Sequence, residues 1–506
     1  MPPLDTARQV GVIGAGTMGA GIAQVAALAG HPVLLHDVDA SRADDAVAAV
    51  GAHLDRLVAK GRLAPADADA ARGRVRAVPS VDDLAGCGMV VEAVVEDLGV
   101  KRDLLARLEA VCAPDTVLAT NTSSLSVTAV AAGLEYPGRV VGLHFFNPAP
   151  VLPLVEVVSG AATSPAVADS VVGTALAWGK TPVRCASTPG FVVNRVARPF
   201  YGEAMRVLEE RAADPATVDA VLREAGGFRM GPCELTDLIG QDVNHAVGAS
   251  VWEQTFHDPR YQPSAVQQRL VDAGWLGRKT GRGFFPYGEG ADAPRPATAD
   301  ARPAPAGGVT VTGGLHVLAG LPDRLRATGV EVRVDEAETQ PVLGLRLPSG
   351  AWLVETAGET ATAMSWEAPV IALDWALDPG TATRFCLAAP DGCPAAALDE
   401  AVGVLQATGA AVSVVDDVPG LVVARTLAML ANEAVDLVHR GEATHSDVDT
   451  AMRLGTGYPF GPYEWGVRHA VDVAEVLDAL HRAYPTGRYR VGARLRRLAE
   501  TAGREQ

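Results

Sequence analysis

The sequence predicts a parallel α/β domain, then an all-helical domain, and then a shortened second copy of both. Three observations support this fold class. Up to residue 187, apolar runs typical of buried strands alternate with helix-like stretches, as in parallel sheets with crossover helices. From 188 to 287 the pattern is mostly that of helices. The features of this helical tract recur 230 positions later, which indicates a duplication.

The first region begins with a strand, a glycine-rich turn and a helix. Residues 9–14 form an apolar run, and residues 17–29 are small and apolar with no proline. A second strand is expected at 31–37. Continuous apolar runs of this length predict strands that are buried on both faces. Further strands are expected at 88–95, 116–119 and 140–143, and a helix at 101–111.

The turn after the first strand carries the pattern GxGxxG, formed by Gly14, Ala15, Gly16, Thr17, Met18 and Gly19. The first glycine permits a tight turn, the second lets the backbone approach a pyrophosphate, and the third lets the helix pack closely on the strand. Free N–H groups at the start of the helix suit phosphates.

Asp37 ends the next strand, 18 residues after Gly19. Its carboxylate would accept hydrogen bonds from an adenosine ribose and would repel a 2′-phosphate. The region is therefore predicted to be a Rossmann-type domain that binds NAD rather than NADP. A glycine-rich turn without any cofactor is the alternative.

Two polar motifs follow later strands of this domain. Residues 121–125 have the sequence NTSSL, and residues 143–148 have the sequence LHFFNP. Glu156 lies twelve residues after His144 in an apolar stretch, where a carboxylate is costly without a partner. An imidazole is a natural partner, and the pair would be suited to proton transfer. A satisfied core histidine and an unrelated half-buried acid are the alternative.

The second helical tract repeats fixed glycine, proline and charged positions of the first. The tract before residue 287 includes helices expected at 195–211 and 215–224. The pairs at the 230-residue spacing are Gly190 and Gly420, Arg195 and Arg425, Glu203 and Glu433, Asp219 and Asp449, and Glu234 and Glu464.

The α/β part of the second copy matches more weakly. Residues 370–372 resemble 117–119, and residues 309–313 resemble 10–14. This alignment places Asp374 opposite Asn121, Ala376 opposite Ser123, Ala388 opposite His144 and Ala424 opposite Asn194, with leucines at two glycine positions and no counterpart of Glu156. The second α/β region is therefore expected to be degenerate, without a cofactor site and without chemistry.

The expected domains follow from these patterns. Residues 288–308 are rich in Ala, Pro, Gly and Asp, a composition typical of an extended linker. The boundaries are 1–187 for the NAD-binding Rossmann domain, 188–287 for the helical substrate and dimerisation domain, 288–308 for the linker, 309–415 for the degenerate Rossmann-like domain and 416–506 for the second helical domain.

Composition excludes several classes of function. The 506 residues are 48% hydrophobic and carry a formal charge of −17, which argues against nucleic acid or an anionic membrane as a partner. No apolar run has the length of a membrane span, and the first residues do not resemble a secretory signal. The six cysteines are scattered without metal-ligand spacing, so we expect no metal site and a cytoplasmic location.

Seven motifs together resemble the L-3-hydroxyacyl-CoA dehydrogenase family. They are GAGTMG, VVEAVVED, NTSSLSVT, GLHFFNPAPVLPLVEVV, TPGFVVNR, GPCELTDLIG and GRKTGRGFF, spread over residues 8–287. The duplicated helical tract further resembles the long bacterial form of this family. That form includes enzymes of phenylacetate catabolism, such as 3-hydroxyadipyl-CoA dehydrogenases, and 3-hydroxybutyryl-CoA dehydrogenases.

The resemblance implies a role for individual residues. His144 would take the proton of the substrate 3-hydroxyl as hydride leaves for NAD, and Glu156 would orient His144. Ser123 and Asn194 would bind the reacting oxygen or the thioester region. The family pattern places Glu96, Lys101, Ser123, Asn147 and Lys279 near NAD. It places Lys60 at the CoA phosphates, although Lys60 is equally suited to be a solvated surface charge.

Substrate and assembly remain open at this point. The substrate is expected to be a short-chain or dicarboxylic acyl-CoA, and a dicarboxylate would need a cation, for which Arg195, Arg198 and Arg229 are candidates. A CoA-independent hydroxy-acid or sugar-acid dehydrogenase and a non-catalytic NAD-binding scaffold are the alternatives. The two helical domains are expected to form an internal pseudo-dimer, and a further homo-oligomer is compatible with this arrangement.

Overall fold

The computed structural model describes residues 2–292, 294–335 and 343–502. Parts of the expected first domain, linker and second copy, namely residues 1, 293, 336–342 and 503–506, lie outside the described residues. The chain forms two compact units. The first comprises residues up to 195 together with 440–456, and the second comprises 196–439 together with residues from 457 onward.

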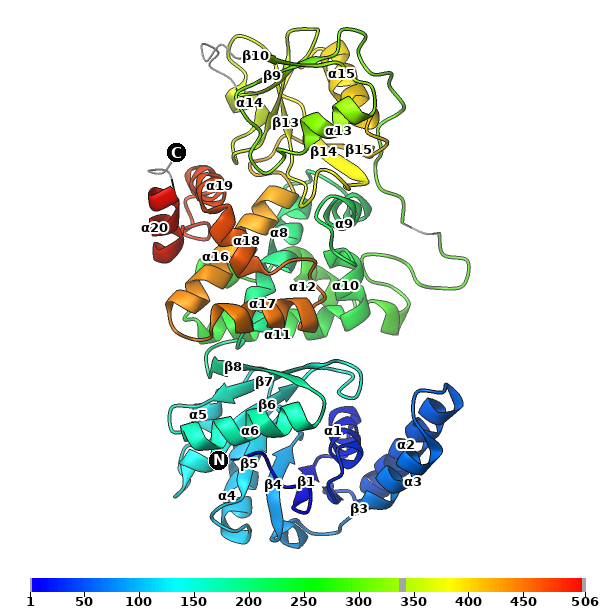
Figure 1. Ribbon diagram of the computed structural model, residues 1–506, viewed down its shortest axis with the longest axis vertical. Coiled ribbons are helices and arrows are strands. Elements are labelled where there is room, and N and C mark those ends of the chain that lie inside the picture. Colours follow the sequence, from blue (N-terminus) through cyan, green and yellow to red (C-terminus); the bar gives the residue numbers. More distant parts are fainter. Residues whose placement is uncertain (1, 293, 336–342, 503–506) are drawn as a thin grey trace. The chain divides into compact units, whose positions relative to one another are not determined.

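The first unit contains an eight-stranded sheet with the order β3-β2-β1-β4-β5-β6-β7-β8 (Figure 1). All neighbours are parallel except β6 and β7, which are antiparallel. The strands are β1 Gln9–Ile13, β2 Val33–His36, β3 Val75–Ala77, β4 Cys87–Glu92, β5 Val117–Thr120, β6 Val140–Phe145, β7 Leu154–Ser159 and β8 Thr181–Ala186. The helices are α1 Thr17–Leu28, α2 Ala40–Ala59, α3 Pro65–Arg74, α4 Leu98–Val111, α5 Val127–Val130 and α6 Pro165–Ala177, and α17 His445–Gly455 joins this unit from the second copy.

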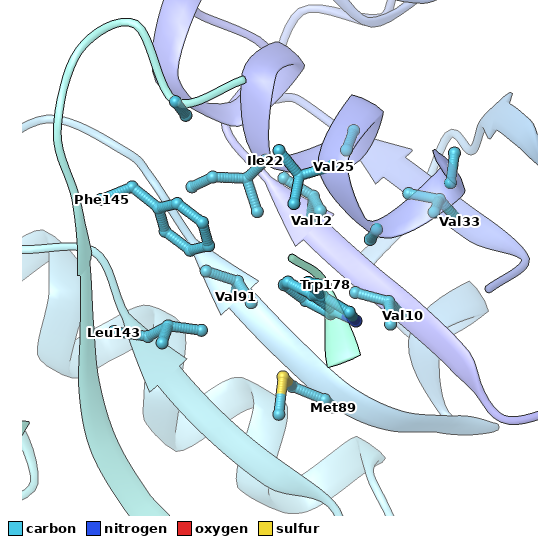
Figure 2. Packing of buried hydrophobic residues seen from close by; sticks show 14 of the residues in the cluster. Val10, Val12, Ile22, Val25, Val33, Met89, Val91, Leu143, Phe145 and Trp178 are labelled. Atoms are coloured by element: carbon cyan, nitrogen blue, oxygen red, sulfur yellow. The ribbon is translucent and has the colours of Figure 1, made fainter. Parts of the chain in front are cut away.

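Helices cover both faces of this sheet, and the central strands are therefore buried on both sides. Figure 2 shows Val12 and Val91 on adjacent strands, with Ile22 of α1 and Phe145 of β6 packed around them. The strands are continuous apolar runs for this reason. The Rossmann-type architecture expected from the sequence is confirmed.

The second unit contains the helical domain that follows the first sheet. The helix expected at 195–211 is instead two helices, α7 and α8, because Pro199 has no N–H to continue a helix and stands in the first turn of α8. The helix expected at 215–224 is confirmed as α9. The helices from this point are α7 Val193–Val196, α8 Arg198–Glu209, α9 Pro215–Glu224, α10 Pro232–Ile239, α11 Gln241–Gln254 and α12 Ala265–Asp272.

The same unit contains a seven-stranded sheet with the order β10-β9-β11-β12-β13-β14-β15. The strands are β9 Val309–Thr312, β10 Val332–Asp335, β11 Gly344–Arg346, β12 Trp352–Glu355, β13 Val370–Leu373, β14 Arg384–Ala388 and β15 Ala411–Val415. The helices are α13 Leu321–Ala327, α14 Ala361–Met364, α15 Ala395–Gln406, α16 Val423–His439, α18 Pro462–Arg468, α19 Ala470–Ala483 and α20 Ala493–Ala502.

The strand pairing corrects the alignment of the second α/β region. Strand β13 is antiparallel to β14, which is parallel to β15, as β6, β7 and β8 are arranged in the first sheet. Residues 370–372 therefore correspond to 140–142 of β6, and not to 117–119 of β5. At that constant spacing of 230 residues, Asp374 stands at the position of His144 and Cys386 at that of Glu156.

The register of the strands agrees with this correction. His144 pairs with Glu156, and the N–H of Asp374 donates to the carbonyl of Cys386. The predicted matches of Asn121, Ser123 and His144 to Asp374, Ala376 and Ala388 were wrong, as was the missing counterpart of the Glu156 segment. The error arose because the short apolar run at 370–373 fits either strand of the first sheet.

The segment expected to be a linker is extended but attached to the second sheet. The N–H of Ala299 donates to the carbonyl of Val412 on β15 at 2.8 Å. The Gln406 side chain on α15 donates to the carbonyls of Ala299 and Asp300 at 3.2 and 3.1 Å. Residues 299 and 300 of this segment are therefore attached to the second α/β domain.

The two copies of the helical domain contact each other within the second unit, where α8 packs against α16. Fully buried Glu203 of α8 accepts hydrogen bonds from Arg488 and Tyr489. Its counterpart Glu433 of α16 is also fully buried and accepts from the Arg-Tyr pair at 260–261. Each buried glutamate is therefore neutralised by an Arg-Tyr pair from the other copy.

Among the described residues, no helix combines the length and the apolar character that a membrane span requires.

Candidate active site

The centre of the site is a buried histidine–carboxylate pair. The Nδ1 atom of His144 lies 2.6 Å from Oε2 of Glu156, on the adjacent antiparallel strand. Glu156 is fully buried and His144 is 6% exposed. The sequence prediction that these two side chains meet is confirmed. A carboxylate at Nδ1 fixes the tautomer and leaves Nε2 as the proton-accepting nitrogen.

The loop after β8 holds the carboxylate from the other side. Oε1 of Glu156 accepts hydrogen bonds from the backbone N–H groups of Val192 and Val193 at 3.0 and 2.9 Å. These N–H groups point at the carboxylate because the chain turns through two residues with positive φ, Gly190 at 75° and Phe191 at 49°. Both carboxylate oxygens are thereby engaged, and Glu156 is held in one orientation.

Ser123 and Asn194 also lie together. The side-chain amide of Asn194 donates to the backbone carbonyl of Ser123 at 3.2 Å. The carboxylate of Glu96 accepts from the N–H groups of Ser123 and Ser124 at 3.0 and 3.1 Å. These contacts fix the loop after β5 at the carboxyl edge of the parallel strands, where ligands bind in folds of this type.

The glycine turn has the shape that a dinucleotide phosphate requires. Gly14 has a φ of 97°, and a Cβ atom on Gly19 would lie 1.7 Å from the carbonyl oxygen of Gly14. A Cβ atom on Gly16 would meet nothing within 4 Å, so the backbone is open to a ligand there. Gly16 is also the N-cap of α1, and in the described part of the chain no side chain caps it.

Asp37 belongs to the same turn. Its Oδ2 atom accepts from the N–H of Ala15 at 2.7 Å, and its Oδ1 atom accepts from the N–H of Asp39 at 3.1 Å. The carboxylate is thus fixed beside the turn, at the end of β2, where a ribose diol would bind. Open backbone at Gly16 and a fixed acid at Asp37 fit NAD.

Lys101 and Glu96, two further residues predicted to lie near the cofactor, belong to one ion-pair network. Buried Lys101 donates to both oxygens of Glu92 at 2.9 Å and lies 3.4 Å from Glu96. Burial acts to raise the pKa of Glu96, but the hydrogen bond from Thr122 and the charge of Lys101 outweigh it and hold that pKa below its ordinary value. Lys101 therefore positions Glu96 through an internal ion pair.

The remaining predicted residues make no hydrogen bond or ion pair to this cluster within the described part of the chain. Asn147 is exposed after β6, and Lys60 is exposed at the C-terminal cap of α2. Lys279 lies in the second unit, where it pairs with Asp242 at 2.6 Å and lowers the pKa of that carboxyl. The roles of these three residues at NAD or CoA stay predictions.

The candidate cations for a dicarboxylate differ in their surroundings. Arg195 is 3% exposed and is paired with Glu442, so its charge is already neutralised. Arg198 lies over the ring of Tyr201, and burial lowers its pKa. Arg229 is exposed. These observations remove Arg195 from the candidates and leave the other two untested.

Sequence reasoning missed several residues that shape the site. Glu92, the buried partner of Lys101, lies within the VVEAVVED motif but was not singled out. Oδ1 of Asn121 accepts from the N–H of Phe145 at 2.8 Å and thereby ties the loop after β5 to the strand that carries His144. The ring of Phe146 lies 4.5 Å from the imidazole of His144. An acid in an otherwise apolar strand was the available signal for Glu92.

The corresponding position in the second α/β domain holds a buried acid in place of the histidine. Asp374 is fully buried, and its carboxylate accepts from the N–H groups of Val422, Val423, Ala424 and Trp375. Burial raises the pKa of Asp374 to about 6, although these N–H donors act to lower it. Val422 and Val423, the equivalents of the two residues whose N–H groups hold Glu156, thus hold an acid at the position of His144.

The N–H groups of the former phosphate turn in the second copy have an internal acceptor. The carboxylate of Glu355, at the end of β12, accepts from the N–H groups of His316, Val317 and Leu318 at 2.9, 2.9 and 3.1 Å. These N–H groups follow β9, as the glycine turn follows β1. An internal carboxylate therefore takes the place that a phosphate would need.

Within the described residues, no group of three or more His, Cys, Asp or Glu side chains could hold a metal ion. The six cysteines are free thiols, five of them buried and Cys393 partly exposed.

Comparison with known families places these features in a wider group. A model described as the NAD binding domain of 3-hydroxyacyl-CoA dehydrogenase matches residues 9–188. A model of the C-terminal domain of the same enzymes matches twice, at 190–287 and 420–505. A model described as the reduced Rossmann-fold domain of 3-hydroxybutyryl-CoA dehydrogenase matches 353–419.

Individual relatives agree with the family models. The chain is 43% identical to an Escherichia coli K12 protein named 3-hydroxyadipyl-CoA dehydrogenase, over 97% of both chains. It is 39% identical to human mitochondrial hydroxyacyl-coenzyme A dehydrogenase over 55% of this chain and 91% of the human one. The crystal structure of an Escherichia coli K12 3-hydroxybutyryl-CoA dehydrogenase superposes with a TM-score of 0.89 and 41% identity, covering 99% of this chain and 100% of that one.

Proposed function

The chain belongs to the 3-hydroxyacyl-CoA dehydrogenase family, and we propose that it oxidises (S)-3-hydroxyacyl-CoA to 3-oxoacyl-CoA, reversibly, with NAD. The single observation that carries this proposal is the buried pair of His144 and Glu156 in the same domain as the open glycine turn. The names of two relatives, 3-hydroxyadipyl-CoA dehydrogenase and hydroxyacyl-coenzyme A dehydrogenase, support this substrate class.

His144 acts as the proton acceptor in this mechanism. The hydrogen bond from Nδ1 to Glu156 directs Nε2 toward the substrate 3-hydroxyl as the base. When the imidazole gains the proton, the Glu156 carboxylate stabilises the positive charge. The two backbone N–H donors keep that carboxylate from turning away, so the pair needs little reorganisation during the reaction. Bound NAD supplies the hydride acceptor.

Ser123 and Asn194 position the substrate. Their mutual hydrogen bond joins the loop after β5 to the loop after β8, so that both polar side chains belong to one rigid edge. Correct placement of the hydroxyl and the thioester relative to His144 accounts for much of the expected rate gain. Gly14–Gly19 and Asp37 would hold the dinucleotide, and Glu96 fixes the loop after β5. We also keep Asn147 and Lys279 as NAD contacts and Lys60 as a CoA-phosphate contact.

The substrate is proposed to be a short-chain or dicarboxylic acyl-CoA. One similar protein is named for 3-hydroxyadipyl-CoA and another for 3-hydroxybutyryl-CoA, and this supports both classes. The test is a kcat/KM profile for acyl-CoA substrates of increasing length, with and without a terminal carboxylate, using NADH and NADPH in the reducing direction. Turnover of free hydroxy acids with no activity on acyl-CoA thioesters would contradict the proposal.

We further propose that the two helical domains serve as each other's dimer partner within one chain. The reciprocal contacts of Glu203 and Glu433 support this arrangement, since each copy neutralises the buried acid of the other. Gel filtration of a chain ending at residue 287 provides the test. It should form dimers or aggregates, and an active, well-folded monomer would contradict the idea.

The free thiols support a cytoplasmic location.

A further inference from the structure

The catalytic unit includes a segment from the second copy. Residues 440–456 belong to the first unit, with α17 packed on β7 and β8. The N–H of Ala186, at the end of β8, donates to the carbonyl of Glu442 at 2.7 Å, and Ala443 forms an isolated bridge with Cys185. A Cβ atom on Gly455 would lie 2.6 Å from Leu154, so α17 approaches the strand that carries Glu156 closely.

The side chain of Glu442 connects the two ends of the catalytic loop. Its Oε2 atom accepts a hydrogen bond from Oγ1 of Thr188 at 2.8 Å, at the start of the loop. The same oxygen pairs with the guanidinium of Arg195 at its end. Between these two anchors lie Val192 and Val193, whose N–H groups hold Glu156.

We propose that Glu442 is a positioning residue for the dehydrogenase reaction, supplied by the second copy to the active site of the first. By fixing both ends of the 188–195 loop, it sets the two N–H donors that orient Glu156 and, through Glu156, the imidazole of His144. This inference rests on the proposed roles of His144 and Glu156. Through Glu442, the second half of the chain contributes to catalysis by the first half.

The second copy provides a natural comparison for this contact. Its equivalent of the loop begins at Val418, which has no hydroxyl group, and the position equivalent to Glu442 is Ala212. The backbone hydrogen bond is retained, since the N–H of Asp416 donates to the carbonyl of Ala212 at 2.9 Å. The arginine equivalent to Arg195 pairs instead with Glu210, at 3.0 Å. A carboxylate therefore bridges the two ends of the loop in the first copy, at Glu442, and an alanine stands at the equivalent position in the second copy.

The test compares Glu442→Gln with Glu210→Gln in the full-length protein. Glu442→Gln should lower kcat for acetoacetyl-CoA reduction about tenfold and leave both KM values within about twofold, because a small misplacement of the base affects the chemical step. Glu210→Gln removes a similar ion pair beside no catalytic group, so its kcat should stay within about twofold of the wild-type value. Equal losses in the two variants, or no loss in Glu442→Gln, would overturn the proposal.

A double-mutant cycle separates positioning from a general structural role. In a Glu156→Gln background, Glu442→Gln should cost little further activity, because the group that it positions is already gone. An undiminished tenfold loss in that background would contradict the proposal. His144→Ala is measured in parallel. Wild-type activity of that variant would refute the proposed function itself, whereas an inactive His144→Ala with a normal Glu442→Gln would refute only the role of Glu442.

Discussion

The two α/β domains of this chain have the same strand arrangement over their last three strands, yet they differ at the positions of the proposed site. In the first domain, His144 and Glu156 lie side by side on β6 and β7, and the glycine turn is open. In the second, Asp374 replaces the histidine, Cys386 replaces the acid, and Glu355 occupies the N–H groups of the turn. The two domains thus differ in a few buried side chains, while the backbone hydrogen bonds between the corresponding strands are kept.

The largest expected effect tests whether chemistry belongs to one domain alone. His144→Ala should lower kcat by about 10²- to 10⁴-fold, because it removes the proposed proton acceptor. The matched change at the equivalent position, Asp374→Ala, should leave kcat of the folded fraction near the wild-type value. Steady-state reduction of acetoacetyl-CoA with NADH measures both. A comparable loss of kcat in the Asp374 variant would show that the second domain takes part in the chemistry.

Both helical copies should depend on their buried glutamate, whereas the α/β copies differ. Glu203→Gln leaves buried Arg488 without its carboxylate partner, which should cost about 3–5 kcal/mol of stability. Glu433→Gln should also destabilise the chain but by less, because Arg260 keeps Asp436 as a second carboxylate partner at 3.1 Å. Calorimetric unfolding of the full chain provides the measurement. A large loss in one variant and none in the other would refute reciprocal packing.

The pH dependence of stability should report the closed site of the second domain. Burial raises the pKa of Asp374 from 3.8 to about 6, so between these values the folded chain keeps a proton that the unfolded chain has released. The contribution of Asp374 is therefore fully present below about pH 4 and falls as pH rises through about 6, by about 3 kcal/mol in all.

Asp374→Asn isolates that contribution. The difference in thermal stability between wild type and Asp374→Asn should change between about pH 4 and 6 and should be constant above that range. Asp219, whose pKa burial raises to about 7, is present in both proteins and cancels in the difference. A difference that is flat from pH 4 to 7 would show that Asp374 stays ionised in the folded protein.

The smallest effect concerns the choice of cofactor. Asp37→Ala removes an expected ribose contact and a charge that would repel the 2′-phosphate of NADPH. The change should therefore weaken NADH binding about tenfold and reduce the ratio of NADH affinity to NADPH affinity. Glu355→Gln, the matched change at the closed turn, should leave NADH affinity unchanged. Fluorescence titration of both variants measures the two dissociation constants. Unchanged discrimination against NADPH in Asp37→Ala would exclude Asp37 as its determinant.

The sequence was sufficient to predict the first domain and the centre of its site. Alternating strands and helices, the GxGxxG turn and an acid within an apolar strand each have a direct physical meaning, and the structure joins His144 to Glu156 as expected. The position of residues 370–373 could not be read in the same way, because a four-residue apolar strand fits several places in a sheet. The resulting misalignment hid Asp374 at the position of His144.

Contacts between distant segments were beyond sequence reasoning for a different reason. Glu442 is 247 residues from Arg195 along the chain, and no local pattern distinguishes it from a surface glutamate. Lys101 lies on α4 like any helix-surface lysine, yet it is 1% exposed because Glu92 accepts both of its short hydrogen bonds. Such pairings depend on tertiary packing, which local periodicity does not encode.

We expect one dinucleotide site per chain, in the first α/β domain. Calorimetric titration of the full-length protein with NADH is the decisive test, because it yields the number of sites together with the affinity. One NADH should bind per chain, and the heat of binding should be lost when Gly16→Asp places a carboxylate in the open turn. Two sites per chain, or binding that survives Gly16→Asp undiminished, would contradict it.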